Sequence, residues 1–309
     1  MSLFPNTVIN LHDIQSTKWL NCIFESLKKN YHIIRAEDLE DYFYKGGNLD
    51  NVCHITFDDG HVSFYDYALP LIRKHKIPVS IYVSPLIAVE GKNFWFQEIK
   101  DYRKDKLIEV INKVIINKNE KIQPISIINF LKTLRLEVIW EIIRLYQKET
   151  NTLPKTPMNM NVNQLIEVRN SGLVEIGAHT LNHPLLKNED RNFVINEIER
   201  SIDYLSEILD SEIKYFAYPN GRYGVDFSDR EVAILKTKGI RLAFSTDKEI
   251  ISNQKSPYLI PRNGSPFVSE SIIAKPYIYS KFFFQILIGE KNYYKYAKAW
   301  GGLKSQVSI

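Results

Sequence analysis

Two adjacent carboxylates, Asp58 and Asp59, follow an apolar run in the stretch VCHITFDDGH at residues 52–61. Like charges repel, so two acids held side by side at the end of a strand need something that offsets the repulsion. A divalent cation would do this: one acid can bind the cation while the other stays free as a general base. Asp-Asp-Gly is also a common turn sequence, and by itself this stretch leaves both interpretations open.

A second group of residues favours the metal interpretation. The stretch EIGAHTLNHP places His179 at the end of another apolar run and His183 four residues later. Two imidazoles and one carboxylate form a facial ligand set that leaves coordination positions open. HTLNH lacks the glutamate of the helical HExxH motif, and Pro184 follows it, so we expect a loop after a strand. The combination is typical of metal-assisted hydrolysis.

Short apolar segments, which we interpret as strands, alternate with amphipathic helical segments and would position these residues. The seven predicted strands are 7–14, 51–57, 77–84, 173–178, 213–218, 240–246 and 258–262. Repeating βα units favour a parallel sheet, and seven units in about 260 residues fit a closed barrel better than an open sheet. Chemistry in such barrels lies at the carboxyl ends of the strands, where both acids are found.

Residues 87–160 interrupt this alternation with two long amphipathic patterns, near 97–118 and 125–149. We interpret them as a helical insertion within one barrel domain spanning 1–309, and we expect it to shape the substrate cleft. Trp95 is predicted to stack on a ring of the substrate, with packing of the helices onto the barrel as the alternative. The aromatic-rich tail, 266–309, is predicted to be partly helical; peripheral membrane contact, closure of the barrel floor and a subunit contact are its possible roles.

Charge and cysteine content exclude several classes of function. The 40 basic and 36 acidic side chains give a formal net charge of +4, and the basic residues are scattered, which argues against a nucleic-acid partner. The two cysteines form no CxxC pair, which argues against a disulfide framework or a thiolate metal site. We find neither a signal-peptide pattern nor an apolar stretch of about 18 residues, so we expect a cytoplasmic protein without a transmembrane segment.

In this order, TFDDG, HTLNH and FAYPNG resemble the motifs of the polysaccharide deacetylase family, also called the NodB-homology or carbohydrate esterase 4 family. The resemblance extends over residues 7–265, apart from the insertion. It implies a distorted (β/α)7 barrel and a metal-dependent hydrolase that removes N-acetyl, sometimes O-acetyl, groups from sugars. The pattern FAYPNG, RLAFST and PRN is similar to the subgroup that includes the poly-N-acetylglucosamine deacetylases.

The resemblance assigns roles to the two acids and the two histidines. Asp58 corresponds to the general base. Asp59, His179 and His183 correspond to the ligands of one divalent metal. A carboxylate and two imidazoles without a thiolate suit Zn²⁺ best, with Co²⁺ or Ni²⁺ as alternatives.

The third motif, FAYPNG, implies a further part of the site. Pro219 matches the proline of that motif, and the backbone N–H of Asn220 corresponds to a donor for the oxyanion. A backbone donor tolerates a change of side chain, so asparagine at this position is compatible with the role. Tyr218 and Pro219 are expected to contact the substrate.

The sequence departs from the family pattern at two positions: the arginine that orients the general base and the histidine that acts as the general acid. Ala217 stands where the third motif usually has an arginine that orients the base, and YLIPRNG lacks the usual fifth-motif histidine. Arg262 could replace the arginine, or could merely pair with a structural acid. His12 is the predicted general acid, because the first strand neighbours the last in a closed barrel and LHD is similar to the YHD found early in the subgroup. The alternative is that His12 only forms hydrogen bonds within the barrel.

The sequence therefore predicts a carbohydrate N-deacetylase. A metal-bound water, deprotonated with help from Asp58, would attack the acetamide of an N-acetylated saccharide or a nucleotide- or lipid-linked glycan precursor in surface-glycan assembly. An O-deacetylase, or an amidase acting on a non-sugar substrate, would have the same metal site. A catalytically silent glycan-binding barrel is the other alternative; the missing arginine and histidine favour it, and the retention of Asp58 beside Asp59 argues against it.

Overall fold

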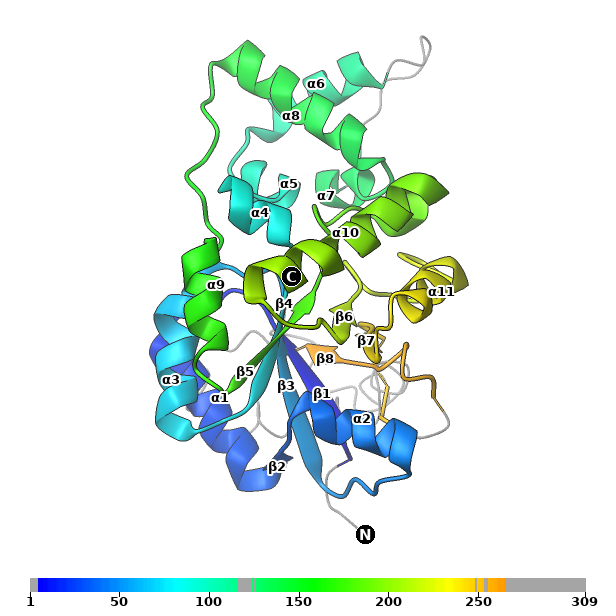
Figure 1. The fold of residues 1–309 in the computed structure, drawn as a ribbon. Coiled ribbons are helices and arrows are strands. Elements are labelled where there is room, and N and C mark those ends of the chain that lie inside the picture. The colour runs from blue at the N-terminus through cyan, green and yellow to red at the C-terminus, as the bar shows by residue number, and fades with distance from the viewer. Residues whose placement is uncertain (1–4, 116–123, 125, 248, 253–254, 265–309) are drawn as a thin grey trace, which may run out of the picture.

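Parallel strands form one curled sheet in the structure, a computed structural model that describes residues 5–115, 124, 126–247, 249–252 and 255–264 (Figure 1). The strands are β1 Thr7–Leu11, β2 His32–Ile33, β3 Val52–Phe57, β4 Val79–Val83, β5 Val174–Ala178, β6 Tyr215–Ala217, β7 Leu242–Phe244 and β8 Asn263–Gly264. Their order is β7-β6-β5-β4-β3-β1-β8, with β2 paired to β3 beside this path. Every pair of neighbouring strands is parallel, as the βα alternation predicted.

The segment before β8 joins the two ends of the sheet. Ile260 forms a parallel bridge with Phe244 of β7, and the N–H of Ile260 donates to the carbonyl of Ala243 at 3.0 Å. Three residues later, Asn263 lies opposite Ile9 of β1. The chain thus has the predicted fold, a distorted (β/α)7 barrel, although its last strand follows the predicted segment 258–262 instead of coinciding with it.

The strands are apolar because both of their faces are covered. Every residue of β1, β3 and β4 is buried. Parallel strands buried on both faces have continuous apolar sequences in place of an alternating pattern, as in TVINL and VSIYV. The outer helices are α1 Thr17–Asn30, α2 Ala36–Lys45, α3 Leu69–His75, α9 Val162–Arg169, α10 Arg191–Leu209 and α11 Asp229–Thr237, with short turns η1 Phe64–Ala68 and η2 Leu186–Asn188.

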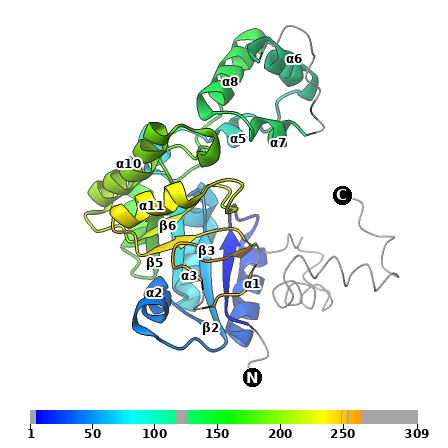
Figure 2. The same ribbon diagram turned by 90° about the vertical axis from the view of Figure 1, so that its right-hand side faces the viewer.

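The insertion after β4 contains α4 Pro85–Glu90, α5 Trp95–Glu98, α6 Lys104–Val114, α7 Ile127–Leu131 and α8 Leu136–Thr150. α6, α7 and α8 stand beyond one end of the barrel (Figures 1 and 2). They have a hydrophobic core of their own, which includes Val110, Ile139 and Ile142. The pattern near 125–149 was predicted as one helix, but it is divided by a turn after Leu131, because apolar periodicity can continue across a short break.

Two predictions concern membranes. Among the helices of the described residues, none has the length and apolar character needed to cross a bilayer. The tail at 266–309, for which membrane contact was one of the possible roles, lies outside the described residues.

Candidate metal centre and active site

The predicted acids and histidines meet at the carboxyl edge of the sheet. Asp58 and Asp59 directly follow β3, and His179 directly follows β5. The backbone hydrogen bonds between neighbouring strands continue past the strand ends. The N–H of Asp58 donates to the carbonyl of Leu11, and the N–H of His179 donates to the carbonyl of Val83. Segments more than a hundred residues apart in the chain thereby place their side chains at one site.

Asp59, His179 and His183 form a compact group of possible metal ligands. Their ligand atoms all lie within 4.8 Å of one another. Oδ1 of Asp59 is 3.6 Å from Nε2 of His179 and 3.5 Å from Nε2 of His183, and although it is buried it accepts no hydrogen bond from the described residues. Atoms that each lie about 2.1 Å from one ion are separated by distances of this size. The three residues therefore fit a divalent cation.

A hydrogen bond orients the imidazole of His179, and burial keeps the imidazole of His183 neutral. Nδ1 of His179 lies 2.6 Å from the carbonyl of Ala217, which orients the ring and leaves Nε2 directed toward Asp59. Burial lowers the pKa of His183 to about 4, so its ring is neutral at pH 7. Burial also acts to lower the pKa of His179, but Asp59 and Asp58 outweigh it and raise that pKa. The phenyl rings of Phe94 and Phe96 pack edge-on against His183, at centroid distances of 5.4 and 5.2 Å.

Asp58 is held by an arginine from the other end of the chain. Nη1 and Nη2 of Arg262 donate to Oδ1 and Oδ2 of Asp58 at 2.7 and 2.8 Å, and Nε of Arg262 donates to the carbonyl of Ser245. Burial acts to raise the pKa of Asp58, but the charges of Arg262 and His179 outweigh it and lower that pKa. Arg262 thus occupies the place beside the carboxylate that was predicted for the missing arginine.

Asn10 is a partner of the same carboxylate that the sequence reasoning missed. Its Nδ2 donates to Oδ2 of Asp58 at 3.0 Å, and within the described part of the chain its own buried Oδ1 accepts no hydrogen bond. Asn10 lies two residues before His12 in the first strand segment, so the alternation of side chains could have indicated that both point to the same face. The Asp58 carboxylate is consequently fixed from β1 and from the segment before β8.

His12, the predicted general acid, lies beside Asp58, and Asn220, the predicted oxyanion donor, lies in the third motif. Nε2 of His12 is 3.9 Å from Oδ2 of Asp58, and the His12 side chain is 52% exposed, so it can meet a substrate from solvent. Asn220 follows Pro219, which is buried beyond the end of β6. In the described part of the chain, the N–H of Asn220 donates no hydrogen bond, so it remains available as a donor.

Unusual backbone conformations are found at the predicted site residues. φ is +70° at Asp59, +63° at Thr180, +57° at His183 and +58° at Asn220. Non-glycine residues rarely adopt positive φ, and such conformations cluster at functional sites. Two ligands and the predicted oxyanion donor share this feature, which supports a functional role for the cluster.

All three predicted substrate contacts, Tyr218, Pro219 and Trp95, lie in the interior instead. Tyr218 is 0% exposed; its ring stacks on Phe227 at 3.6 Å, and its hydroxyl donates to the carbonyl of Tyr258. Trp95 is buried in the core of the insertion, which is the alternative given for it. Because all three side chains are buried, the structure argues against direct substrate contact by Tyr218, Pro219 and Trp95.

Glu197 of α10 braces the loop that carries His183, and the sequence reasoning missed it. Its carboxylate accepts hydrogen bonds from the backbone N–H and from Nδ2 of Asn182, at 2.9 and 2.7 Å, while its carbonyl accepts from Leu181. Glu197 looked like one more acid on a long amphipathic helix, with no pattern that marked it. Its burial identifies it as part of the support for the metal centre.

Comparison with known proteins is consistent with this geometry. Residues 127–243, which include His179, His183 and Asn220, match the family model described as polysaccharide deacetylase. The chain is 22% identical over 278 residues to a poly-β-1,6-N-acetyl-D-glucosamine N-deacetylase of Staphylococcus aureus, covering 82% of this chain and 76% of that protein.

Solved structures show the same fold at low sequence identity. IcaB from Ammonifex degensii matches with a TM-score of 0.59 and 19% identity, over 85% of this chain and 93% of that one. A de-N-acetylase from Aggregatibacter actinomycetemcomitans matches with a TM-score of 0.56 and 16% identity, over 90% and 99%. The family-model match and the relative from Staphylococcus aureus confirm the resemblance to the polysaccharide deacetylase family that was predicted from TFDDG, HTLNH and FAYPNG.

Proposed function

We propose that the protein is a metal-dependent hydrolase that removes N-acetyl groups from a saccharide containing N-acetylglucosamine. The observation that carries this proposal is a second carboxylate beside the possible ligands Asp59, His179 and His183. This carboxylate, Asp58, is not one of the ligands and is oriented by Arg262 and Asn10. A protein that only bound a glycan would need no carboxylate held in this way. The relative from Staphylococcus aureus, named for deacetylation of poly-β-1,6-N-acetylglucosamine, supports this choice of sugar.

Asp59, His179 and His183 would hold the cation, which supplies Lewis acidity by polarising a carbonyl oxygen and lowering the pKa of a water. Asp58 is the proton acceptor for the attacking water, because its lowered pKa keeps it ionised at neutral pH. Arg262 and Asn10 fix the direction of its oxygens. The carboxylate therefore needs no reorientation when the substrate arrives.

The remaining roles concern the oxyanion and the leaving amine. The N–H of Asn220 donates to the oxygen on which negative charge develops. His12 gives a proton to the amine nitrogen as the C–N bond breaks, and the products are acetate and the free amine. Its distance of 3.9 Å from Asp58 supports the proposal that the acid and the base serve one reaction centre.

The test is acetate release from β-1,6-linked N-acetylglucosamine pentamer by the purified full chain with added Zn²⁺. We expect mass spectrometry to show stepwise loss of acetyl groups, chelator to abolish it, and the Asp58→Asn variant to lack it. Parallel reactions contain an O-acetylated sugar and a non-sugar acetamide. Cleavage of either of these without cleavage of the pentamer would replace the proposal by the O-deacetylase or amidase alternative, and cleavage of none would favour a silent binding barrel.

A further inference from the structure

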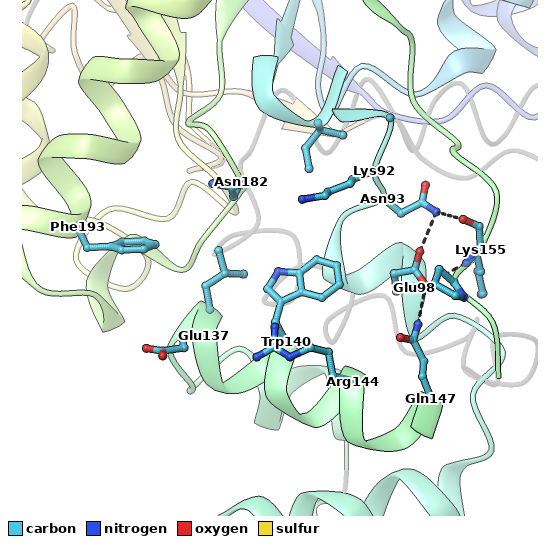
Figure 3. A pocket seen from close by; sticks show the side chains of 14 residues that line it. Lys92, Asn93, Glu98, Glu137, Trp140, Arg144, Gln147, Lys155, Asn182 and Phe193 are labelled. Carbon is cyan, nitrogen blue, oxygen red and sulfur yellow. Dashed lines mark hydrogen bonds between the residues drawn. The ribbon is translucent and has the colours of Figure 1, made fainter. Parts of the chain in front are cut away.

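A pocket of about 540 Å³ lies between the helical insertion and the barrel (Figure 3). Glu137, Trp140 and Arg144 of α8 line one side. Lys92 and Asn93, which follow α4, and Asn182 line the other side, toward the barrel. The volume is within the range of pockets that hold small molecules, about 300–1,000 Å³.

Two residues that line this pocket are sequence neighbours of residues at the candidate metal site. Asn182 directly precedes the ligand His183, and Asn93 directly precedes Phe94, whose ring packs against His183. A chain-like substrate held at the metal centre could therefore extend along these residues into the pocket.

The barrel-side wall is held in place by hydrogen bonds. Nδ2 of Asn93 donates to Glu98 and to the carbonyls of Lys155 and Thr156, and its Oδ1 accepts from the N–H of Met158. Asn182 donates two hydrogen bonds to the carboxylate of Glu197, one from its backbone N–H and one from Nδ2. The shape of the pocket is thus formed before a ligand enters, which lowers the entropic cost of binding.

The chemistry of the pocket suits a polar ring without a large charge. The indole of Trp140 is half-buried and projects into the pocket (Figure 3), where its face can cover the C–H groups of a sugar. Glu137 and Arg144 lie three residues before and four residues after it, on the same helix face. Neither forms an ion pair with another described residue, so each can bind a hydroxyl or amide group of a ligand.

The charges around the pocket nearly balance. Lys92 pairs with Glu90, and Lys155 pairs with Asp101, which leaves Arg144 on α8 opposed by Glu137 on the same helix and by the buried Glu98. A polyanionic ligand such as a diphosphate would gain from Arg144 but would be repelled by Glu137. The balance favours a neutral pyranose that offers both donors and acceptors.

We propose that this pocket binds a second sugar ring of the saccharide, beyond the ring whose acetamide reaches the metal centre. The proposal rests on the proposed function, because the ligand is a further unit of the same substrate. Trp140 forms the stacking platform, and Glu137, Arg144 and Asn182 bind the hydroxyl and amide groups at its edge. The insertion would in this way make the protein select oligosaccharides over single sugars.

The test compares β-1,6-linked N-acetylglucosamine oligomers of increasing length, from the dimer to the pentamer. We expect kcat/KM of the wild-type protein to rise with length, and Trp140→Ala to reduce that gain about tenfold, mainly through KM. Trp140→Phe retains a stacking ring and should recover most of the gain. Equal length dependence in the wild type and Trp140→Ala would overturn the proposal.

A binding measurement separates this proposal from the proposed function. In the Asp58→Asn background, the pentamer is titrated calorimetrically into proteins with and without Trp140→Ala, so no turnover is needed. Weaker binding in the Trp140→Ala protein supports the pocket even if no acetate is released by the wild type. Unchanged binding overturns it even if the wild type is an active deacetylase.

Arg144 provides a variant with little risk to folding, because it is exposed and unpaired among the described residues. Its matched control is Lys148→Ala, which removes an exposed cation one turn further along α8 and outside the pocket lining. We expect Arg144→Ala to weaken pentamer binding several-fold and Lys148→Ala to leave it unchanged. Equal effects of the two variants would indicate attraction by overall charge and would contradict a specific contact in the pocket.

Discussion

The guanidinium of Arg262 and the carboxylate of Asp58 form a buried, bidentate ion pair, with side chains that are 0% and 3% exposed. The two residues are separated by 204 positions in the chain, and the contact joins the segment before β8 to the end of β3. A pair of this kind stabilises the closed barrel only while both partners are present, because either charge alone would be buried without compensation.

Arg262→Met is therefore expected to lower the free energy of unfolding by about 3–5 kcal/mol. In the Asp58→Asn background the same substitution should cost clearly less, since no unpaired carboxylate is left behind. Denaturant unfolding of the two single variants and the double variant measures the coupling. Arg241→Met, which breaks an exposed pair with Glu40, is the matched control, with an expected cost of about 0–1 kcal/mol. Additive effects of the two buried substitutions would contradict the coupling.

The ligand cluster predicts one divalent ion per chain. His179→Ala and His183→Ala each remove an imidazole whose Nε2 lies near Oδ1 of Asp59, so each variant should lose most of its bound metal. Elemental analysis after dialysis against buffered Zn²⁺ gives the stoichiometry. His32→Ala, an exposed histidine of β2, is the control and should keep full occupancy. Full occupancy in both ligand variants would refute the assignment.

Asp58→Asn should retain the metal and lose turnover. The amide can still form hydrogen bonds, but it cannot accept the proton of the attacking water, and loss of a general base typically costs about 10²–10⁴-fold in rate. Metal content and kcat are measured on the same preparation. A variant that keeps near-normal kcat with full metal occupancy would show that another group is the base.

His12→Ala separates a general acid from a structural histidine. In amide hydrolysis the leaving group is an amine, which leaves poorly unless it is protonated. The leaving group of an activated acetyl ester needs little protonation. We expect cleavage of the N-acetylated saccharide to fall steeply and cleavage of the ester largely to survive. Similar losses on both substrates, or no loss on the amide, would count against the acid role.

Glu197 predicts a pH-dependent contribution to stability. Burial raises its pKa to about 6 from 4.5, outweighing the hydrogen bonds from Asn182 that lower it. The carboxyl group of Glu197 thus binds its proton more tightly in the folded state than in the unfolded state. The resulting stabilisation of the folded state is fully present below pH 4.5 and is lost as the pH rises through about 6.

The Glu197→Gln variant has no carboxyl group to titrate at this position, so comparison with it isolates the pH dependence that comes from Glu197. We expect the free energy of unfolding of the wild type, relative to this variant, to fall by about 2 kcal/mol between about pH 4 and pH 7. Glu207→Gln, at an exposed position of the same helix, is the control. A constant difference between the wild type and Glu197→Gln over this range would disprove the raised pKa.

The barrel and most of the metal centre could be predicted because both depend on local patterns. Continuous apolar runs such as VCHITF mark strands buried on both faces, and their alternation with amphipathic helices leads to a parallel sheet. In a parallel sheet all carboxyl ends lie at one edge, so residues that follow two different strands must come close together. The positions of Asp59 and His179 in the sequence therefore determined that they would meet.

Contacts between distant segments were decided only by the tertiary structure. The sequence offered Arg262 as a candidate without showing which acid it binds, and it gave no indication of Glu197 or of the pocket beside Trp140. An apolar or amphipathic pattern says that a side chain is buried, but not against which partner. Trp95 and Tyr218 show the same limit: their aromatic rings suit a cleft or a core equally well, and only the packing of α5 and β6 against their neighbours placed them inside.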